Sequence, residues 1–194
     1  MNIVNPLPGL SSACKRFPTG RTLLSLALGL AMQQAPAQTA PSTVTWGGND
    51  GETWTTGFWD DISGSPQAGD IVQLLAPAGS NLGSQTVTYD ETGAPAYASL
   101  TIDATAPDSM TLQSDNANAL NVTGNFAIGK NGNGIFQQSA GAVSAAQVLL
   151  GGEVFGTDTS NGNGQYTMSG GSLTTSTLTV GNLGSGSFTQ SGGD

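Results

Sequence analysis

The chain has 194 residues, of which 29 are Gly, 13 are Asp or Glu and only 4 are Lys or Arg, so its formal net charge is -9. It contains no His, which excludes a Ser-His-Asp triad, an imidazole base and a His-ligated metal site within the chain. The shortage of basic residues argues against nucleic acid as a partner, because phosphate contacts need Lys and Arg.

The N-terminus has the features of an export signal. Residues 15–21 hold three basic side chains, residues 23–32 are an apolar run of ten, and residues 35–37 (Ala-Pro-Ala) match a cleavage site. Ten residues rise about 15 Å as a helix, about half of a bilayer core, so we expect no transmembrane helix; a buried core helix is the alternative. We therefore expect a signal peptide at residues 1–37 and an exported protein, extracellular or on the outer cell surface.

Removal of residues 1–37 would leave 157 residues with all 13 acids and one base, Lys130, so the formal charge would become -12. Cys14 would leave with the signal, and the remaining chain has no Cys. An exported domain without disulfides depends on backbone hydrogen bonds and core packing, and it has no thiol nucleophile.

Beyond the signal the pattern predicts strands and no helix. Short β-branched runs alternate with turn residues every 8–12 residues, which is typical of an all-β fold. Residues 38–98 hold all three Trp residues, Trp46, Trp54 and Trp59. We expect this segment to form an N-terminal cap and the first strands, because the first coil of a solenoid otherwise exposes its core and a strand edge.

Residues 99–194 carry an internal repeat. Apolar pairs recur every ten residues at 100/102, 110/112 and 120/122, and each pair faces one side of a strand. Glycine at 129, 151 and 181 and an aromatic residue at 136, 166 and 188 then mark three units of 22 residues, the middle one with eight extra residues within 152–163. The alignment matches Val143 with Leu173, Val148 with Leu178 and Leu150 with Val180.

Stacking such units would merge their small apolar faces into one core, so we expect a β-solenoid whose coil has three short strands with glycine corners. Another all-β fold, such as a sandwich, and a disordered low-complexity chain are the alternatives. The kept spacing of apolar positions argues against disorder.

Two motifs carry a family resemblance. The opening Trp46-Gly-Gly, Trp54 and Trp59 precedes Pro66-x-Ala-Gly-Asp70-x-Val72, and units of Gly-x-Phe/Tyr-x-Gln/Met-Ser-Gly-Gly stand at 134–141, 164–171 and 186–193. Together they resemble the N-terminal part of bacterial surface proteins built from autotransporter-associated β-strand repeats; proteins sorted by a PEP-type exosortase signal are similar. The resemblance implies export, a right-handed β-helix or related solenoid, and a surface role. Because the chain stops directly after a unit's Gly-Gly, we expect the array to be truncated at its C-terminus.

Catalytic and metal-binding candidates are few. The densest acidic cluster joins Asp60 and Asp61 with Asp50, Glu52 and Asp70. We expect solvated turn carboxylates there, since a glycosidase needs two carboxylates at a set separation and a lyase needs a base. Oxygen-rich segments at 49–52, 115–118 and 158–163 could bind Ca²⁺, but ordinary turns use the same residues, and we nominate no metal ligand or other cofactor.

The tryptophans Trp46, Trp54 and Trp59 could contact carbohydrate by stacking on sugar rings; packing at the solenoid end is the alternative. Phe136, Tyr166 and Phe188 are expected to form an internal aromatic stack. We therefore expect a non-catalytic structural or adhesion module that binds carbohydrate or other cell-surface molecules through a repetitive polar face. The alternatives are a polysaccharide-active β-helix enzyme and a non-functional fragment of a larger passenger.

Overall fold

The computed structural model describes residues 41–60, 64–76 and 83–194, apart from 153, 156 and 157. These residues belong to one compact unit, residues 38–194. The expected signal peptide at 1–37 and the acidic residue Asp61 lie outside the described residues. The described part contains strands and no helix, and therefore no helix with the length and apolarity to cross a membrane.

The strands form two large sheets, whose strands are parallel except for β2. In chain order, the first sheet contains β1 (Thr43–Trp46), β2 (Trp59–Asp60), β3 (Ile71–Ala76), β5 (Ala96–Tyr97), β6 (Ser99–Ala104), β8 (Leu120–Ile128), β10 (Ala142–Leu150) and β14 (Ser172–Val180). The second contains β4 (Gln85–Thr88), β7 (Met110–Ser114), β9 (Asn133–Gln138), β13 (Asn163–Met168) and β15 (Ser185–Gln190). A hairpin of β11 (Val154–Phe155) and β12 (Asp158–Thr159) stands apart.

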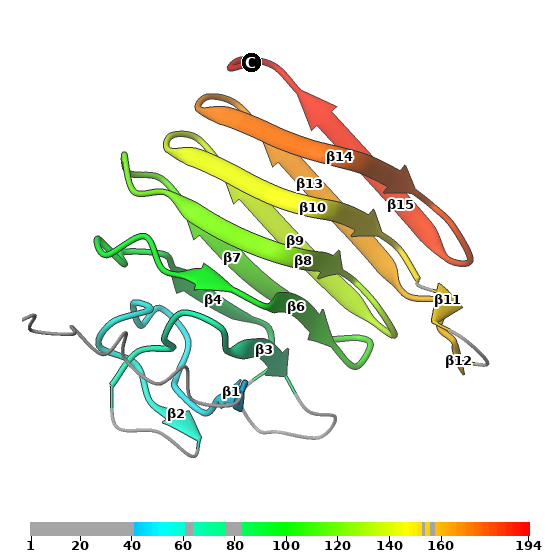
Figure 1. Ribbon diagram of the computed structural model, residues 1–194. Helices are drawn as coiled ribbons and strands as arrows, with labels where there is room; N and C mark the ends of the chain where they lie inside the picture. The colour runs from blue at the N-terminus through cyan, green and yellow to red at the C-terminus, as the bar shows by residue number, and fades with distance from the viewer. Residues whose placement is uncertain (1–40, 61–63, 77–82, 153, 156–157) are drawn as a thin grey trace, which may run out of the picture. The chain divides into compact units, whose positions relative to one another are not determined.

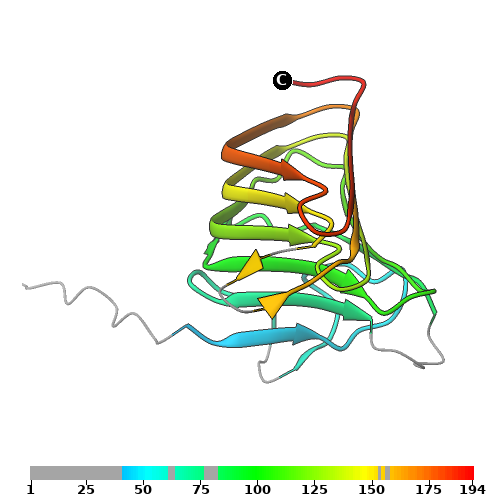
Figure 2. The ribbon, with the colours of Figure 1, turned by 90° about the vertical axis from the view of Figure 1, so that its right-hand side faces the viewer.

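The chain alternates between the two sheets, and each strand pairs with strands of the coils before and after it. The first sheet runs β14-β10-β8-β6-β3-β1-β2 and the second runs β15-β13-β9-β7-β4, so both stack in chain order. Figure 1 shows the two sheets one behind the other, and Figure 2 shows the coils stacked edge to edge. This arrangement is a β-solenoid with one strand of the second sheet per coil, which confirms the predicted fold class.

From β5 onward each coil has three strand segments, of which two are joined in the later coils. β5 and β6 are separate, yet both pair with β8: Tyr97 lies beside Val122, and Leu100 lies beside Phe126. β8, β10 and β14 are each nine residues long and contain both segments. The third segment is the strand of the second sheet.

The pairing register confirms the predicted repeat. Val143 pairs with Leu173, Val148 with Leu178 and Leu150 with Val180. Tyr166 pairs with both Phe136 and Phe188, although these lie 30 and 22 residues away. The β11–β12 hairpin lies within the eight-residue insertion predicted in 152–163, which leaves the stacking undisturbed.

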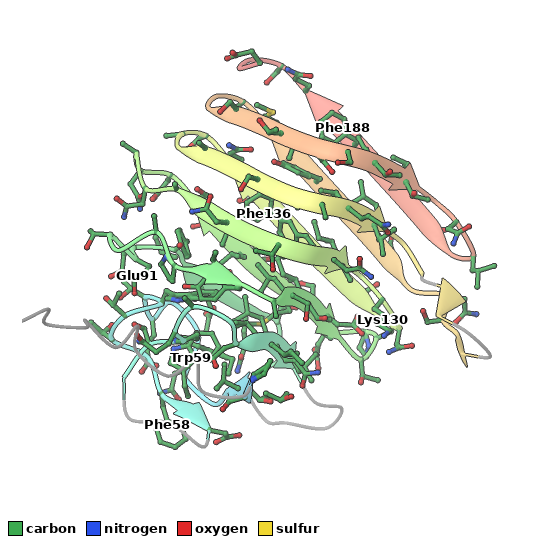
Figure 3. The ribbon with its side chains drawn as sticks, in the orientation of Figure 1. Phe58, Trp59, Glu91, Lys130, Phe136 and Phe188 are labelled. Atoms are coloured by element: carbon green, nitrogen blue, oxygen red, sulfur yellow. The ribbon has the colours of Figure 1, made fainter. Side chains whose placement is uncertain are left out.

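The core lies between the sheets and is filled by the alternate, inward residues of each strand. The rings of Phe136, Tyr166 and Phe188 stack edge to face across successive coils, with centroid separations of 4.8 and 5.1 Å. Phe126 of the first sheet packs edge-on against Phe136 of the same coil at 5.1 Å. Figure 3 labels Phe136, which is fully buried, and Phe188 in the last coil. The predicted internal aromatic stack is therefore present.

The corners after the long strands require glycine. Gly129, Gly151 and Gly181 have φ of +67°, +73° and +69°, a region that side chains disfavour. At Gly151 an added Cβ would also overlap the carbonyl oxygen of Ser185 in the next coil. The closest approach between coils at this corner is thus made by backbone alone.

The two ends of the stack differ. At the N-terminal end β2 pairs antiparallel with β1, and Trp54 N donates to Thr88 O at 2.8 Å, so residues 51–60 contact the edges of both sheets. At the other end β14 and β15 are the outermost strands of their sheets, and Leu178, Val180 and Leu183 are 36%, 45% and 43% exposed.

Candidate functional site

The outer face of the second sheet carries a row of polar side chains that runs from coil to coil. The pairing places Thr88, Gln113, Gln137, Thr167 and Thr189 in one register. Their strand neighbours on the inner face, Leu112, Phe136 and Tyr166 among them, are buried. Because side chains alternate along a strand, burial of the apolar neighbours turns this row outward.

A second polar row lies at the corner that follows these strands. Ser139 N donates to Ser114 O at 2.9 Å, and Ser169 N donates to Gln138 O at 2.8 Å, so the backbone ladder continues into the corner. Asp115 occupies the same corner in the coil of β7. The two rows therefore run side by side across the coils.

Between the two rows lies a groove of about 310 Å³. We call it the glutamine groove; its lining comes from three successive coils and consists of Gln113, Asp115, Gln137, Gln138, Ser139, Thr167 and Ser169. Gln113 Nε2 donates to Gln137 Oε1 at 3.0 Å, which joins two coils along one wall of the groove. The lining contains amides, hydroxyls and one carboxylate, and no aromatic or basic group.

Gln138 is the buried residue of this lining, and its contacts fix it firmly. Its Nε2 donates to the carbonyl oxygens of Gly141 and Ser172, each at 3.0 Å. Its Oε1 accepts a hydrogen bond from the Tyr166 hydroxyl. The Gln138 side chain thus ties the wall of the groove to the core and to the following coil.

A second groove, of about 420 Å³, lies on the outer face of the first sheet. Ile71, Gln73, Ser99, Thr101, Gly124, Asn125, Ala127 and Lys130 line it. Lys130, labelled in Figure 3, is the single base beyond residue 37. Amides and hydroxyls accompany the ammonium group, and no carboxylate is among the described residues of this lining.

The three tryptophans named from the sequence come together at the N-terminal end. Trp46, Trp54 and Trp59 are 4%, 0% and 1% exposed, and Trp59 packs edge-on against the other two at 5.1 and 4.8 Å. Trp59 Nε1 donates to Trp54 O at 2.9 Å. Their burial leaves no ring face open for a sugar and supports the packing alternative. The exposed ring at this end is Phe58, at 62% (Figure 3).

Asp50 and Asp70 accept hydrogen bonds from backbone amides. Asp50 Oδ1 accepts from Thr86 N at 2.7 Å, and Asp70 Oδ2 accepts from Gln67 N at 2.8 Å. Hydrogen bonds from Asn49 hold the pKa of Glu52 below its usual range, the opposite of what a general acid needs. These contacts agree with the turn interpretation of the cluster.

The oxygen-rich segment at 115–118 bends between two strands and is held by hydrogen bonds of Asn116. Asn116 Nδ2 donates to Tyr89 O at 2.6 Å, and its Oδ1 accepts from Asn118 N at 3.0 Å. Within the described residues no three His, Cys, Asp or Glu side chains are grouped as a metal site would require. Calcium binding stays a prediction.

No family model, no curated protein and no solved structure matches this chain.

The sequence did not single out the residues of the glutamine groove, although a signal for them was present. In each repeat the aromatic residue is followed by an outward polar residue and, two positions later, by a serine: Gln137 and Ser139 after Phe136, and Thr167 and Ser169 after Tyr166. Reading the residues next to the core positions would have revealed the part of both rows that lies in these repeats, but not Gln113 and Asp115.

Proposed function

We propose that this chain is an exported, non-catalytic module of the outer cell surface that has a structural and adhesive role. The observation that carries the proposal is the row Thr88, Gln113, Gln137, Thr167 and Thr189, which repeats an uncharged polar side chain on five consecutive coils. Such a surface can make many weak contacts at once, and their sum gives useful avidity without any strong single site.

The charge distribution supports a role outside the cell. The chain beyond residue 37 has one base and 13 acids, and a strongly negative protein resists association with its own copies and with nucleic acid. Export follows from the sequence pattern of residues 1–37, and the resemblance to autotransporter-associated repeats points the same way. We infer that the solenoid serves as a stiff carrier of its polar faces.

The chemistry of the side chains supports a non-catalytic role. The chain lacks His, and it has one base beyond residue 37, Lys130. Glu52 has a lowered pKa and is held by Asn49. A polysaccharide lyase or glycosidase would need a base or a raised carboxyl pKa close to a second carboxylate.

The test is expression of the full 194-residue chain in a bacterial host, compared with a chain that begins at Gln38. We expect the full chain to appear outside the cytoplasm with the mass of residues 38–194 and to increase attachment of the cells, or of beads coated with it, to glycan-bearing surfaces. The chain without residues 1–37 should remain inside. Retention of both forms in the cytoplasm, attachment no better than an empty vector, or turnover of a polysaccharide would contradict the proposal.

A further inference from the structure

The glutamine groove has the repeat distance of the solenoid. Its lining is supplied by β7, β9 and β13 and the corners that follow them, so equivalent positions are separated by one strand spacing, about 4.8 Å. Gln113, Gln137 and Thr167 form one wall, and Asp115, Ser139 and Ser169 form the other. A ligand that fits this groove along the solenoid axis must present similar groups at a similar interval.

The groups in the groove define the chemistry of that ligand. Amides donate and accept, hydroxyls do both, and the carboxylate of Asp115 accepts from two hydroxyls at once. The lining contains one negative charge and no positive one, which disfavours phosphates and uronates. A chain of uncharged sugars supplies hydroxyl pairs on each unit, and one sugar unit is comparable in length to the spacing between coils.

The groove is organised before any ligand arrives. Gln138 is 1% exposed and bonds to Gly141, Ser172 and Tyr166, while Gln113 bonds to Gln137. Side chains already fixed lose less entropy on binding. The groove also lies on a sheet face, where the backbone groups of the strands are paired with neighbouring strands, so a peptide could not add to it as an extra strand.

We propose that the glutamine groove binds a linear, uncharged polysaccharide along the solenoid axis, with about one sugar per coil. The proposal rests on the adhesive function proposed above and names the site and ligand class for it. Gln113, Gln137 and Thr167 contact one edge of the sugar chain, and Asp115, Ser139 and Ser169 contact the other. Hydrogen bonding carries the interaction, so the affinity of a single short oligosaccharide is low and rises with its length.

The experiment measures binding of neutral oligosaccharides to the exported protein by calorimetry or NMR titration. The probes are cello-, manno- and xylo-oligosaccharides of two to about six sugars, with an oligogalacturonate and a cationic peptide as the competing ligand classes. We expect at least one neutral series to bind saturably, with affinity rising until the chain spans the three coils of the groove.

Matched variants locate the site. Gln137 and Gln165 are exposed glutamines on the outer face of adjacent strands, but only Gln137 lines the groove. Gln137→Ala should weaken binding about fivefold, the loss expected for one hydrogen-bonding side chain, and Asp115→Asn should weaken it to a similar extent. Gln165→Ala should bind as the unchanged protein does. Both glutamines face solvent, so we expect the variants to fold. Circular dichroism checks this.

Several outcomes would overturn the inference: no saturable binding to any neutral series, preference for the oligogalacturonate or the peptide, or equal effects of Gln137→Ala and Gln165→Ala. If export and attachment hold while these titrations fail, only the groove assignment is wrong. If glycan binding holds while the protein stays in the cytoplasm, the proposed function fails and the groove assignment stands.

Discussion

At the scale of single residues, the corner glycines decide whether coils can stack. Gly151 combines a φ of +73° with contact against the backbone of Ser185, so both conformation and space exclude a side chain. Gly51 has a similar φ of +80°, but an added Cβ there would meet nothing within 4 Å. Comparing substitutions at Gly51 and Gly151 therefore separates two losses of stability: the loss from an unfavourable φ, which both share, and the loss from overlap with the next coil, which only Gly151 has.

We therefore predict that Gly151→Ala lowers the free energy of unfolding by more than about 2 kcal/mol, whereas Gly51→Ala costs about 1 kcal/mol. Urea denaturation followed by circular dichroism measures both. Equal losses at the two positions would mean that the coils do not approach each other at Gly151 as described.

The three tyrosines predict how stability depends on pH. Burial raises the pKa of Tyr89 to about 12, and burial also raises the pKa of Tyr97 and Tyr166. The unfolded chain has tyrosines that titrate near pH 10, so above that pH the unfolded state loses protons that the native state keeps. The contribution of the buried tyrosines to the free energy of unfolding is therefore fully present below pH 10 and is lost as the pH rises toward 12.

The measurement is tyrosinate absorbance recorded together with circular dichroism during alkaline titration. We expect the absorbance of tyrosinate to appear only as the β signal is lost, well above pH 10. Ordinary titration near pH 10 in a protein that keeps its β signal would show that these tyrosines are not buried.

The sequence predicted the residues of the core better than those of the glutamine groove. The glycine corners and the partners of Val143, Val148 and Leu150 follow from spacing, because repeated apolar positions must share a register. The groove did not follow, because it depends on which outward residues of different coils become neighbours. The earlier coils differ in length, with 25 residues from Val87 to Leu112 and 24 from Leu112 to Phe136. Because the repeat is not constant there, the sequence does not show which outward residues become neighbours.

At the scale of elements, the aromatic stack links the coils through the second sheet. Phe136 is fully buried between Phe126 and Tyr166, whereas Phe188 contacts Tyr166 from the outermost strand and is only partly buried. The contribution of each ring to stability should follow its burial, because the loss on truncation combines transfer and cavity terms.

We predict that Phe136→Ala lowers the free energy of unfolding by about 3–5 kcal/mol and Phe188→Ala by less than about 2 kcal/mol. Denaturant unfolding of the two variants makes the comparison, with β content checked beforehand. A larger loss at Phe188 than at Phe136 would be inconsistent with an aromatic stack that ends in the last coil.

The sequence did not predict which strand segments of a coil would join into one strand. A coil of three strands was expected, and β5 and β6 are two of them, but in β8 the same two segments run together without a break. Backbone hydrogen bonding between coils, which sequence patterns do not report, decides whether the bend between the segments interrupts the strand. All three rings of the Trp-rich segment are buried.

At the scale of the whole described unit, function depends on regular stacking. The 13 acids are concentrated in the first coils, ten of them at or before Asp115, so the later coils present nearly uncharged faces. Such a distribution keeps copies apart while leaving polar rows open to neutral ligands. Both proposals require the row Thr88, Gln113, Gln137, Thr167 and Thr189 to stay in register over all five coils.

Spin-label distances test that requirement most directly. After Cys14→Ser the chain has no Cys, so nitroxides can be placed at Thr88 and Thr189 in one protein and at Gln113 and Thr189 in another. Four strand spacings predict about 19 Å for the first pair and three predict about 14 Å for the second, each with a narrow distribution. A broad distribution, or a first distance no longer than the second, would contradict the stacked row on which the account depends.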